Sequence, residues 1–226
     1  MERLLQFLTN HFNPLPVLGE IMRIFPDALI WGIGFFAILT SSFPFAIFFL
    51  SLLESLALYF GIRQFNTWLG VFTEKNTKNS FEQKCKTGFT SVTLNTLSMF
   101  GSDHQLAFPS APVYIMAVAI SYILSMLMTF KNELETLGTS YASRLYLSAI
   151  GMSIMLFLLM AYRSFRGCDS FFIVILSAIT GLAIGAILLK QNKLIIGNNG
   201  INMLGIPLLY NSTASGSALY VCNKGS

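Results

Sequence analysis

The chain has 226 residues, of which 54% are hydrophobic and only 11% are charged, and its net charge is +4. A soluble domain carries about 25% charged residues because its surface faces water. This composition therefore excludes an ordinary soluble domain and predicts a membrane protein whose exterior faces lipid. The basic residues are few and spread through the loops, which argues against a nucleic-acid partner.

The N-terminal arm, residues 1–25, has apolar side chains at helical spacing on both sides of Asn13-Pro14. This pattern predicts one or two amphipathic helices that lie in the membrane interface.

The next segment, residues 26–62, carries only two charges, Asp27 and Glu54. A single helix over Ala28–Ile62 would rise ~52 Å, well beyond a ~30 Å hydrocarbon core. We therefore predict a transmembrane hairpin with spans at 28–41 and 45–62, which turns at Ser41-Ser42-Phe43-Pro44. The first span is short, so we expect it to tilt little or to begin before Asp27.

A polar connection, residues 63–111, leads to a core of three apolar stretches within residues 112–190. These stretches are Pro112–Phe130, which is ended by Lys131, Leu145–Tyr162, which lies between Arg144 and Arg163, and Ser170–Leu189, which lies between Asp169 and Lys190. Each stretch is long enough to span a bilayer, which makes five spans in total. Nine of the 14 basic residues then lie on one side. The distribution predicts a multi-pass protein with its N-terminus on the cytoplasmic side and its tail on the opposite side.

The extramembrane tail, residues 191–226, has two β-capable runs, 201–210 and 218–222, around a polar turn. This pattern predicts a short hairpin. Asn211-Ser212-Thr213 is a glycosylation sequon, which makes Asn211 a candidate acceptor. The expected fold is therefore all-α, a polytopic transmembrane helical bundle of about five spans with interfacial N-terminal helices and a β-hairpin-like tail.

Two features inside the spans carry chemistry of their own. A charge buried within a span costs ~3 kcal/mol, so Glu54 must face a partner or water. This favours either a proton or ion pathway, as in a small transporter or channel, or a protonated side chain against Ser51 or Ser55. Gly181 and Gly185 form a small-xxx-small pattern, which allows close helix packing within the chain or with an oligomer or protein partner.

The three cysteines, Cys85, Cys168 and Cys222, lie far apart in the sequence. They show neither the spacing of zinc ligands nor that of a disulfide framework. We therefore expect no metal and no cofactor.

The turn Phe108-Pro109-Ser110 opens the third span, and the segment that contains Arg163 and Arg166 joins the fourth span to the fifth on the same side. In the order and spacing of helices, residues 86–190 resemble the phosphatidic acid phosphatase type 2 (lipid phosphate phosphatase) superfamily. The second motif of that family is Phe-Pro-Ser-Gly-His at the mouth of a helix, and the third begins Ser-Arg at the end of the next helix. The resemblance implies a phosphate pocket made by Ser110 with Arg163 or Arg166.

The residues that would cleave a phosphate ester are missing from this pattern. Ala111-Pro112 stands where the family has Gly-His, no histidine lies near Asp169 to Ile173, and the chain has no Arg-Pro for the first motif. Covalent phosphoryl transfer through a histidine requires that histidine. His104, shortly before Ser110, is the remaining candidate for a rearranged active site, and an exposed turn is the alternative for it.

We therefore expect a non-catalytic protein, either a phosphatase-like scaffold (a pseudoenzyme) or a binder of anionic phospholipid through Ser110, Arg163 and Arg166. Two alternatives remain. One is an active lipid phosphatase with a rearranged site that uses His104, and the other is a small transporter or channel built around Glu54. The simpler role for Ser110 is an N-cap with a proline in the first turn. The simpler role for the two arginines is snorkelling to lipid headgroups.

The tail segment from Gly205 to Cys222 is also similar to membrane proteins of large DNA viruses. This likeness implies a virion membrane as the location of the protein.

Overall fold

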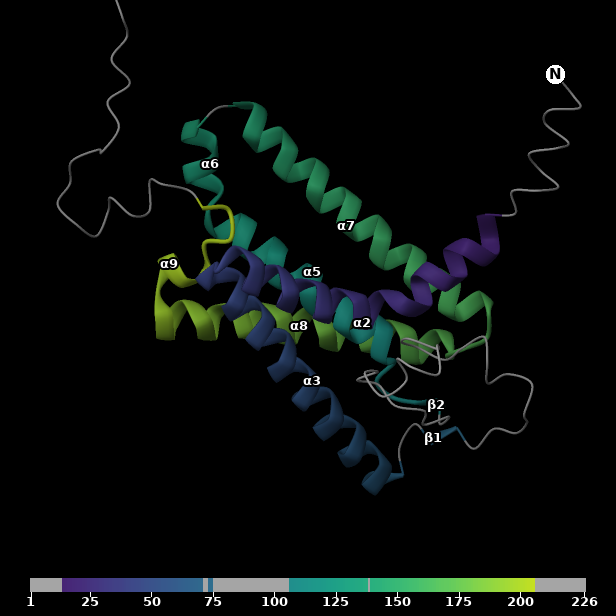
Figure 1. The fold of residues 1–226 in the computed structure, drawn as a ribbon. Coiled ribbons are helices and arrows are strands. Elements are labelled where there is room, and N and C mark those ends of the chain that lie inside the picture. Colours follow the sequence, from purple (N-terminus) through teal and green to yellow (C-terminus); the bar gives the residue numbers. More distant parts are fainter. Residues whose placement is uncertain (1–13, 71–72, 75–105, 138, 206–226) are drawn as a thin grey trace, which may run out of the picture.

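A computed structural model describes residues 14–70, 73–74, 106–137 and 139–205. This part of the chain is helical apart from one short pair of strands (Figure 1). The elements are, in chain order, α2 (Pro14–Thr40), α3 (Phe43–Leu69), β1 (Thr73–Glu74), β2 (Leu106–Ala107), α5 (Ala111–Thr129), α6 (Lys131–Leu137), α7 (Thr139–Phe165), α8 (Phe171–Ile196) and α9 (Asn198–Ile201). The two strands pair antiparallel, with Thr73 opposite Ala107.

Four helices are long and apolar enough to cross a membrane, so the chain is a multi-pass integral membrane protein. They are Phe43–Leu69, Ala111–Thr129, Ser143–Phe165 and Phe171–Ile196. The expected all-α membrane fold is confirmed, but the first of the five expected spans falls short of this length, because the apolar part of α2 is limited to Ile24–Thr40. The sidedness of the termini stays a prediction, and the expected tail hairpin falls largely beyond residue 205, outside the described residues.

Helix α2 begins at Pro14 and continues through Pro26 to Thr40. The part of the expected interfacial arm from residue 14 onward therefore belongs to the same helix as the first apolar stretch. The predicted turn between α2 and α3 is confirmed. Ser41 adopts a positive φ of 47°, and Ser42 is the extended N-cap of α3, with a proline in the first turn.

Helices α5 and α8 run parallel and side by side at the centre of the bundle. A Cβ on Gly181 would lie 2.6 Å from the carbonyl oxygen of Tyr114, and a Cβ on Gly185 would overlap the carbonyl of Val118. Small residues at a helix contact let two backbones approach closely. The small-xxx-small face of α8 is thus occupied by α5 of the same chain.

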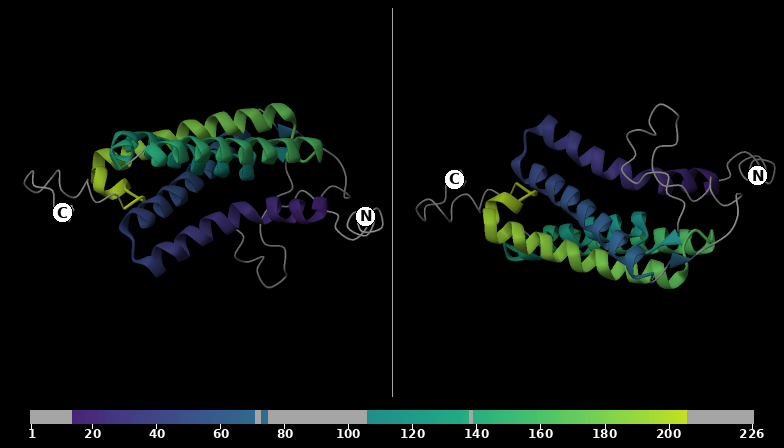
Figure 2. Two further views of the ribbon diagram at one scale, coloured as in Figure 1. Left: turned by 90° about the horizontal axis from the view of Figure 1, so that it is seen from above. Right: turned by 90° about the horizontal axis from the view of Figure 1, so that it is seen from below.

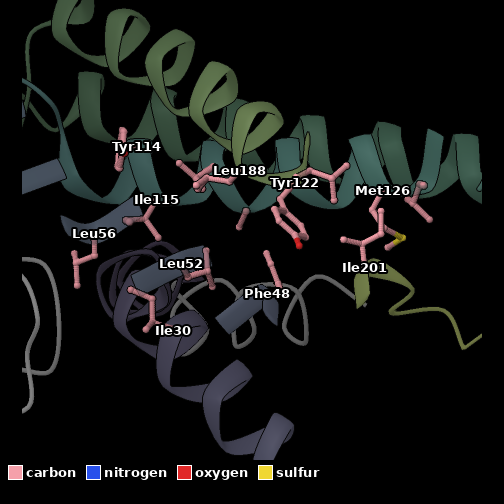
Figure 3. Close-up of a cluster of buried hydrophobic side chains, with 14 of the residues drawn as sticks. Ile30, Phe48, Leu52, Leu56, Tyr114, Ile115, Tyr122, Met126, Leu188 and Ile201 are labelled. Atoms are coloured by element: carbon pink, nitrogen blue, oxygen red, sulfur yellow. The ribbon is translucent and has the colours of Figure 1, made fainter. Parts of the chain in front are cut away.

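Helix α3 covers another side of α5. Figure 2 shows that α2 and α3 form a hairpin that opens away from its turn, with α3 running into the α5–α8 pair. The rings of Phe48 and Tyr122 lie with their centroids 4.8 Å apart, and the Tyr114 hydroxyl donates a 3.0 Å hydrogen bond to the carbonyl of Ser55. Side chains of α3 and α5 face one another in this cluster, together with Leu188 of α8 (Figure 3). Helix α5 is consequently the most enclosed helix of the described bundle.

Candidate functional site

The candidate site lies where α5 and α8 begin and α7 ends. Ser110 is the N-cap residue of α5 and has an extended backbone. After α7, Gly167 has a φ of 68°, the left-handed conformation in which glycine commonly ends a helix. This reversal brings Asp169 back toward Arg163, and Ser170 then caps the N-terminus of α8. Three helix ends that are distant in sequence thus meet at one place.

Asp169 accepts two hydrogen bonds on a single carboxylate oxygen. The Ser110 hydroxyl donates to Asp169 Oδ2 at 2.6 Å, and Arg163 Nε donates to the same atom at 2.7 Å. The backbone N–H of Ser110 donates to Ser177 Oγ at 2.7 Å, and the Ser177 hydroxyl donates to the carbonyl of Ile173 at 2.6 Å. We call Ser110, Arg163, Asp169 and Ser177 the polar cluster.

The polar cluster is almost closed to its surroundings. Ser110 is 3% exposed, Asp169 is 8% exposed and Ser177 is fully buried, while the Arg163 side chain is 11% exposed. A buried charge is tolerated when it is paired and hydrogen-bonded. Arg163 and Asp169 compensate one another, and the charge-assisted bonds are short, as expected for ionised partners.

Of the sequence-predicted ligand-binding residues, Ser110 and Arg163 meet directly at Asp169. Ser110 is the predicted N-cap, but its hydroxyl bonds Asp169 and makes no capping hydrogen bond. Arg166 is exposed, and its guanidinium lies 5.7 Å from the centroid of the Tyr162 ring. The two arginines therefore occupy different environments, one buried in an ion pair and one at the surface.

The predicted intramembrane acid, Glu54, lies far from the polar cluster. It is exposed on α3 and accepts hydrogen bonds from Gln191 Nε2 at 3.1 and 3.3 Å. Besides Asp169, the described chain holds another buried acid, Asp27 of α2, which is fully buried and has an interaction within the protein. From the sequence, Asp27 was expected only to mark the boundary of a span and Glu54 to lie within one. In the structure Asp27 is the buried residue and Glu54 is exposed. The transporter alternative built around Glu54 stays a hypothesis.

Two further candidates, His104 and Asn211, lie outside the described residues.

Sequence reasoning missed two buried polar residues of α8. Ser177 completes the polar cluster, and Asn192 donates to Ser51 Oγ at 2.6 Å and to the Tyr122 hydroxyl at 2.9 Å. Ser177 interrupts the apolar run that opens α8, and a polar residue in such a run is the signal that could have found it. Asn192 lies among Lys190, Gln191 and Lys193, so its sequence surroundings gave no such signal. A polar side chain in a membrane helix finds a partner within the bundle because lipid offers none.

The sequence analysis found no sign of a disulfide among the three cysteines, and for Cys168 this is wrong. Cys168 is disulfide-bonded and 2% exposed, directly before Asp169. The other two cysteines, Cys85 and Cys222, lie outside the described residues. The spacing of the three cysteines along the chain gave no indication of this bond.

Among the residues that the structure describes, no group of three or more His, Cys, Asp or Glu side chains is placed to hold a metal ion. Comparison with known proteins finds no matching family model, no matching curated protein and no matching solved structure.

Proposed function

We propose that the chain is a non-catalytic membrane scaffold whose helices are arranged like those of a lipid phosphatase. The observation that carries the proposal is the position of Asp169, whose carboxylate engages the Ser110 hydroxyl and the Arg163 guanidinium together. These are the two groups that the sequence resemblance assigns to a phosphate. A phosphate at this place would meet a carboxylate of like charge and donors that are already engaged. The polar cluster therefore supports a structural role, in which Asp169 joins the ends of three helices.

A phosphatase assay is the first test of a non-catalytic role. Purified protein reconstituted with phosphatidic acid is expected to release no more inorganic phosphate than protein-free vesicles, because the polar cluster has no imidazole to attack phosphorus. Phosphate release is measured for the wild type, for His104→Ala and for His11→Ala, which removes the other histidine of the chain and is the matched control. Release that persists in His11→Ala and disappears in His104→Ala would establish the enzyme and overturn the scaffold.

Binding of anionic phospholipid is a second candidate function, and the exposure of Arg166 favours it. Arg163 is engaged by Asp169, whereas Arg166 is held over the Tyr162 ring at the surface, close to the end of a membrane-crossing helix. A guanidinium in this position suits the phosphate of a lipid headgroup.

Arg166→Ala is expected to weaken the binding of anionic phospholipid about fivefold, since one basic residue near an anionic surface contributes ~1 kcal/mol. The affinity is measured in nanodiscs with a graded fraction of anionic lipid, at low and high salt. Lys190→Ala is the control, because Lys190 is an exposed basic residue toward the other end of α8. Equal losses in the two variants would mean that the effect is one of net charge, and no loss in Arg166→Ala would remove this candidate.

A further inference from the structure

A cavity of about 730 Å³ lies between α2, α5 and α7. Its wall includes Leu29 of α2, Ile120 and Ile123 of α5, and Met152 and Met155 of α7. Of the described residues that line it, only Arg144 and Ser148 are polar. The Ser148 hydroxyl donates to the carbonyl of Leu145 at 2.8 Å, so its hydrogen is satisfied within the helix. The cavity wall is therefore apolar apart from one cation.

The cavity exists because one part of α7 does not pack closely against the other helices. In Figure 1, α7 and α8 share one end of the bundle and diverge toward the other. Only 17% of the membrane-crossing stretch of α7 is buried in the bundle, less than in the other three long apolar helices. Gly151 also lines the cavity, and a Cβ added to it would meet no atom within 4 Å. The space is open to the outside of the bundle rather than enclosed, so in a membrane it is filled by something that enters from outside the bundle.

Water does not suit this cavity, because a buried water needs two to four polar partners. Hydrocarbon from the bilayer does suit it, and its size falls within the ~300–1,000 Å³ range of ligand pockets. From Arg144 to Met155 the rise along α7 is ~16 Å, about half of a ~30 Å hydrocarbon core. This length matches the depth that one leaflet gives to an acyl chain.

A phospholipid suits this wall better than a helix of a partner or of a second copy. The described wall is apolar along its length and carries a single cation, Arg144, at one end. This is the arrangement expected for an acyl chain that continues into a phosphate headgroup.

Arg144 lies at one end of the cavity wall and at the beginning of the membrane-crossing stretch Ser143–Phe165. This is the depth of the lipid headgroups. A guanidinium has five N–H donors in a planar fork that matches a phosphate. Arg144 is exposed at this end of the wall.

We propose that this cavity binds a membrane phospholipid, with one acyl chain between α2, α5 and α7 and the phosphate at Arg144. The site lies at the opposite end of α7 from the polar cluster, so it is independent of the scaffold and of Arg166. The ligand class is a diacyl lipid that carries a phosphate.

The full-length protein tests this proposal directly. After purification in mild detergent, native mass spectrometry is expected to find one phospholipid retained per chain. Gly151→Leu, which places a side chain in the cavity, is expected to reduce retention at least tenfold. Gly32→Leu is the matched control, because Gly32 is also an exposed helical glycine with no atom within 4 Å of an added Cβ, and it lies on α2 outside the cavity wall. Thermal unfolding of both variants shows whether they remain folded.

A second variant separates the headgroup from the acyl chain. Arg144→Gln is expected to bind the phospholipid about tenfold more weakly while its binding of diacylglycerol, which has no phosphate, is unchanged. Excess inorganic phosphate is expected not to displace the bound lipid. Retention of lipid by folded Gly151→Leu, equal affinities of wild type and Arg144→Gln, or a change of oligomeric state as the main effect of Gly151→Leu would each overturn the proposal.

Discussion

Gly185→Leu is expected to prevent α5 and α8 from packing and to leave the protein unable to fold stably. A Cβ at Gly185 would overlap the carbonyl oxygen of Val118 and lie 2.9 Å from the Cβ of Ser121. The carbonyl belongs to the backbone of a buried helix, so the clash cannot be relieved by a change of rotamer. Separating the helices would also break the bond from the Ser121 hydroxyl to the carbonyl of Leu182. We expect a loss of about 3 kcal/mol or more, at the upper end for overpacking.

The measurement is the fraction of folded protein in detergent as a function of temperature, with Gly61→Leu as control. Gly61 is in α3, and an added Cβ there meets no atom within 4 Å. The same experiment distinguishes the two roles of the small-residue pattern. In-chain packing predicts loss of the folded monomer, whereas an oligomer face predicts a folded monomer that has lost its partner. A folded, monomeric Gly185→Leu protein would contradict the close packing of α5 and α8.

The positions of the membrane helices followed from the sequence because charge is expensive in lipid. A charged residue, Lys131, follows α5, and charged residues enclose the apolar runs within α7 and α8. The length argument separated α2 from α3 at Ser41-Ser42. The meeting of Ser110 with Arg163 was also expected, since α5 begins and α7 ends on the same side of the predicted bundle.

The contacts between helices did not follow from the sequence. A soluble helix reveals its buried face by its apolar stripe, but in lipid the buried and exposed faces are both apolar. Nothing in the pattern of α7 therefore predicted that Leu147 would face outward and Leu159 inward, or that a cavity would lie beside them. The role of Asp169 was difficult to predict from the sequence for another reason. Its role depends on a reversal at Gly167 that returns it to Arg163, a geometry that the residue types alone do not specify.

Asp169→Ala is expected to destabilise the protein by about 3–5 kcal/mol, because it removes the carboxylate that compensates the largely buried Arg163 charge. Ser110→Ala removes one neutral donor and is expected to cost less, about 1–3 kcal/mol. The double variant Asp169→Ala/Arg163→Met removes both charges and is expected to recover much of the loss, since replacing a buried ion pair by apolar side chains is often close to neutral. Thermal unfolding in detergent measures all three. A double variant no more stable than Asp169→Ala would mean that the ion pair is not the source of the effect.

The same variant tests whether Asp169 occupies the place of a phosphate. In Asp169→Ala, Arg163 Nε and the Ser110 hydroxyl lose their shared acceptor, so an added phosphate or sulfate can accept from both. A ligand that binds only the folded state stabilises it, by ~2.7 kcal/mol at one hundred times its dissociation constant. Phosphate is therefore expected to raise the unfolding temperature of Asp169→Ala but not that of the wild type or of Asp169→Ala/Arg163→Met. If phosphate stabilises all three proteins equally, the anion acts elsewhere, and Asp169 is then a helix-end carboxylate with no relation to a phosphate pocket.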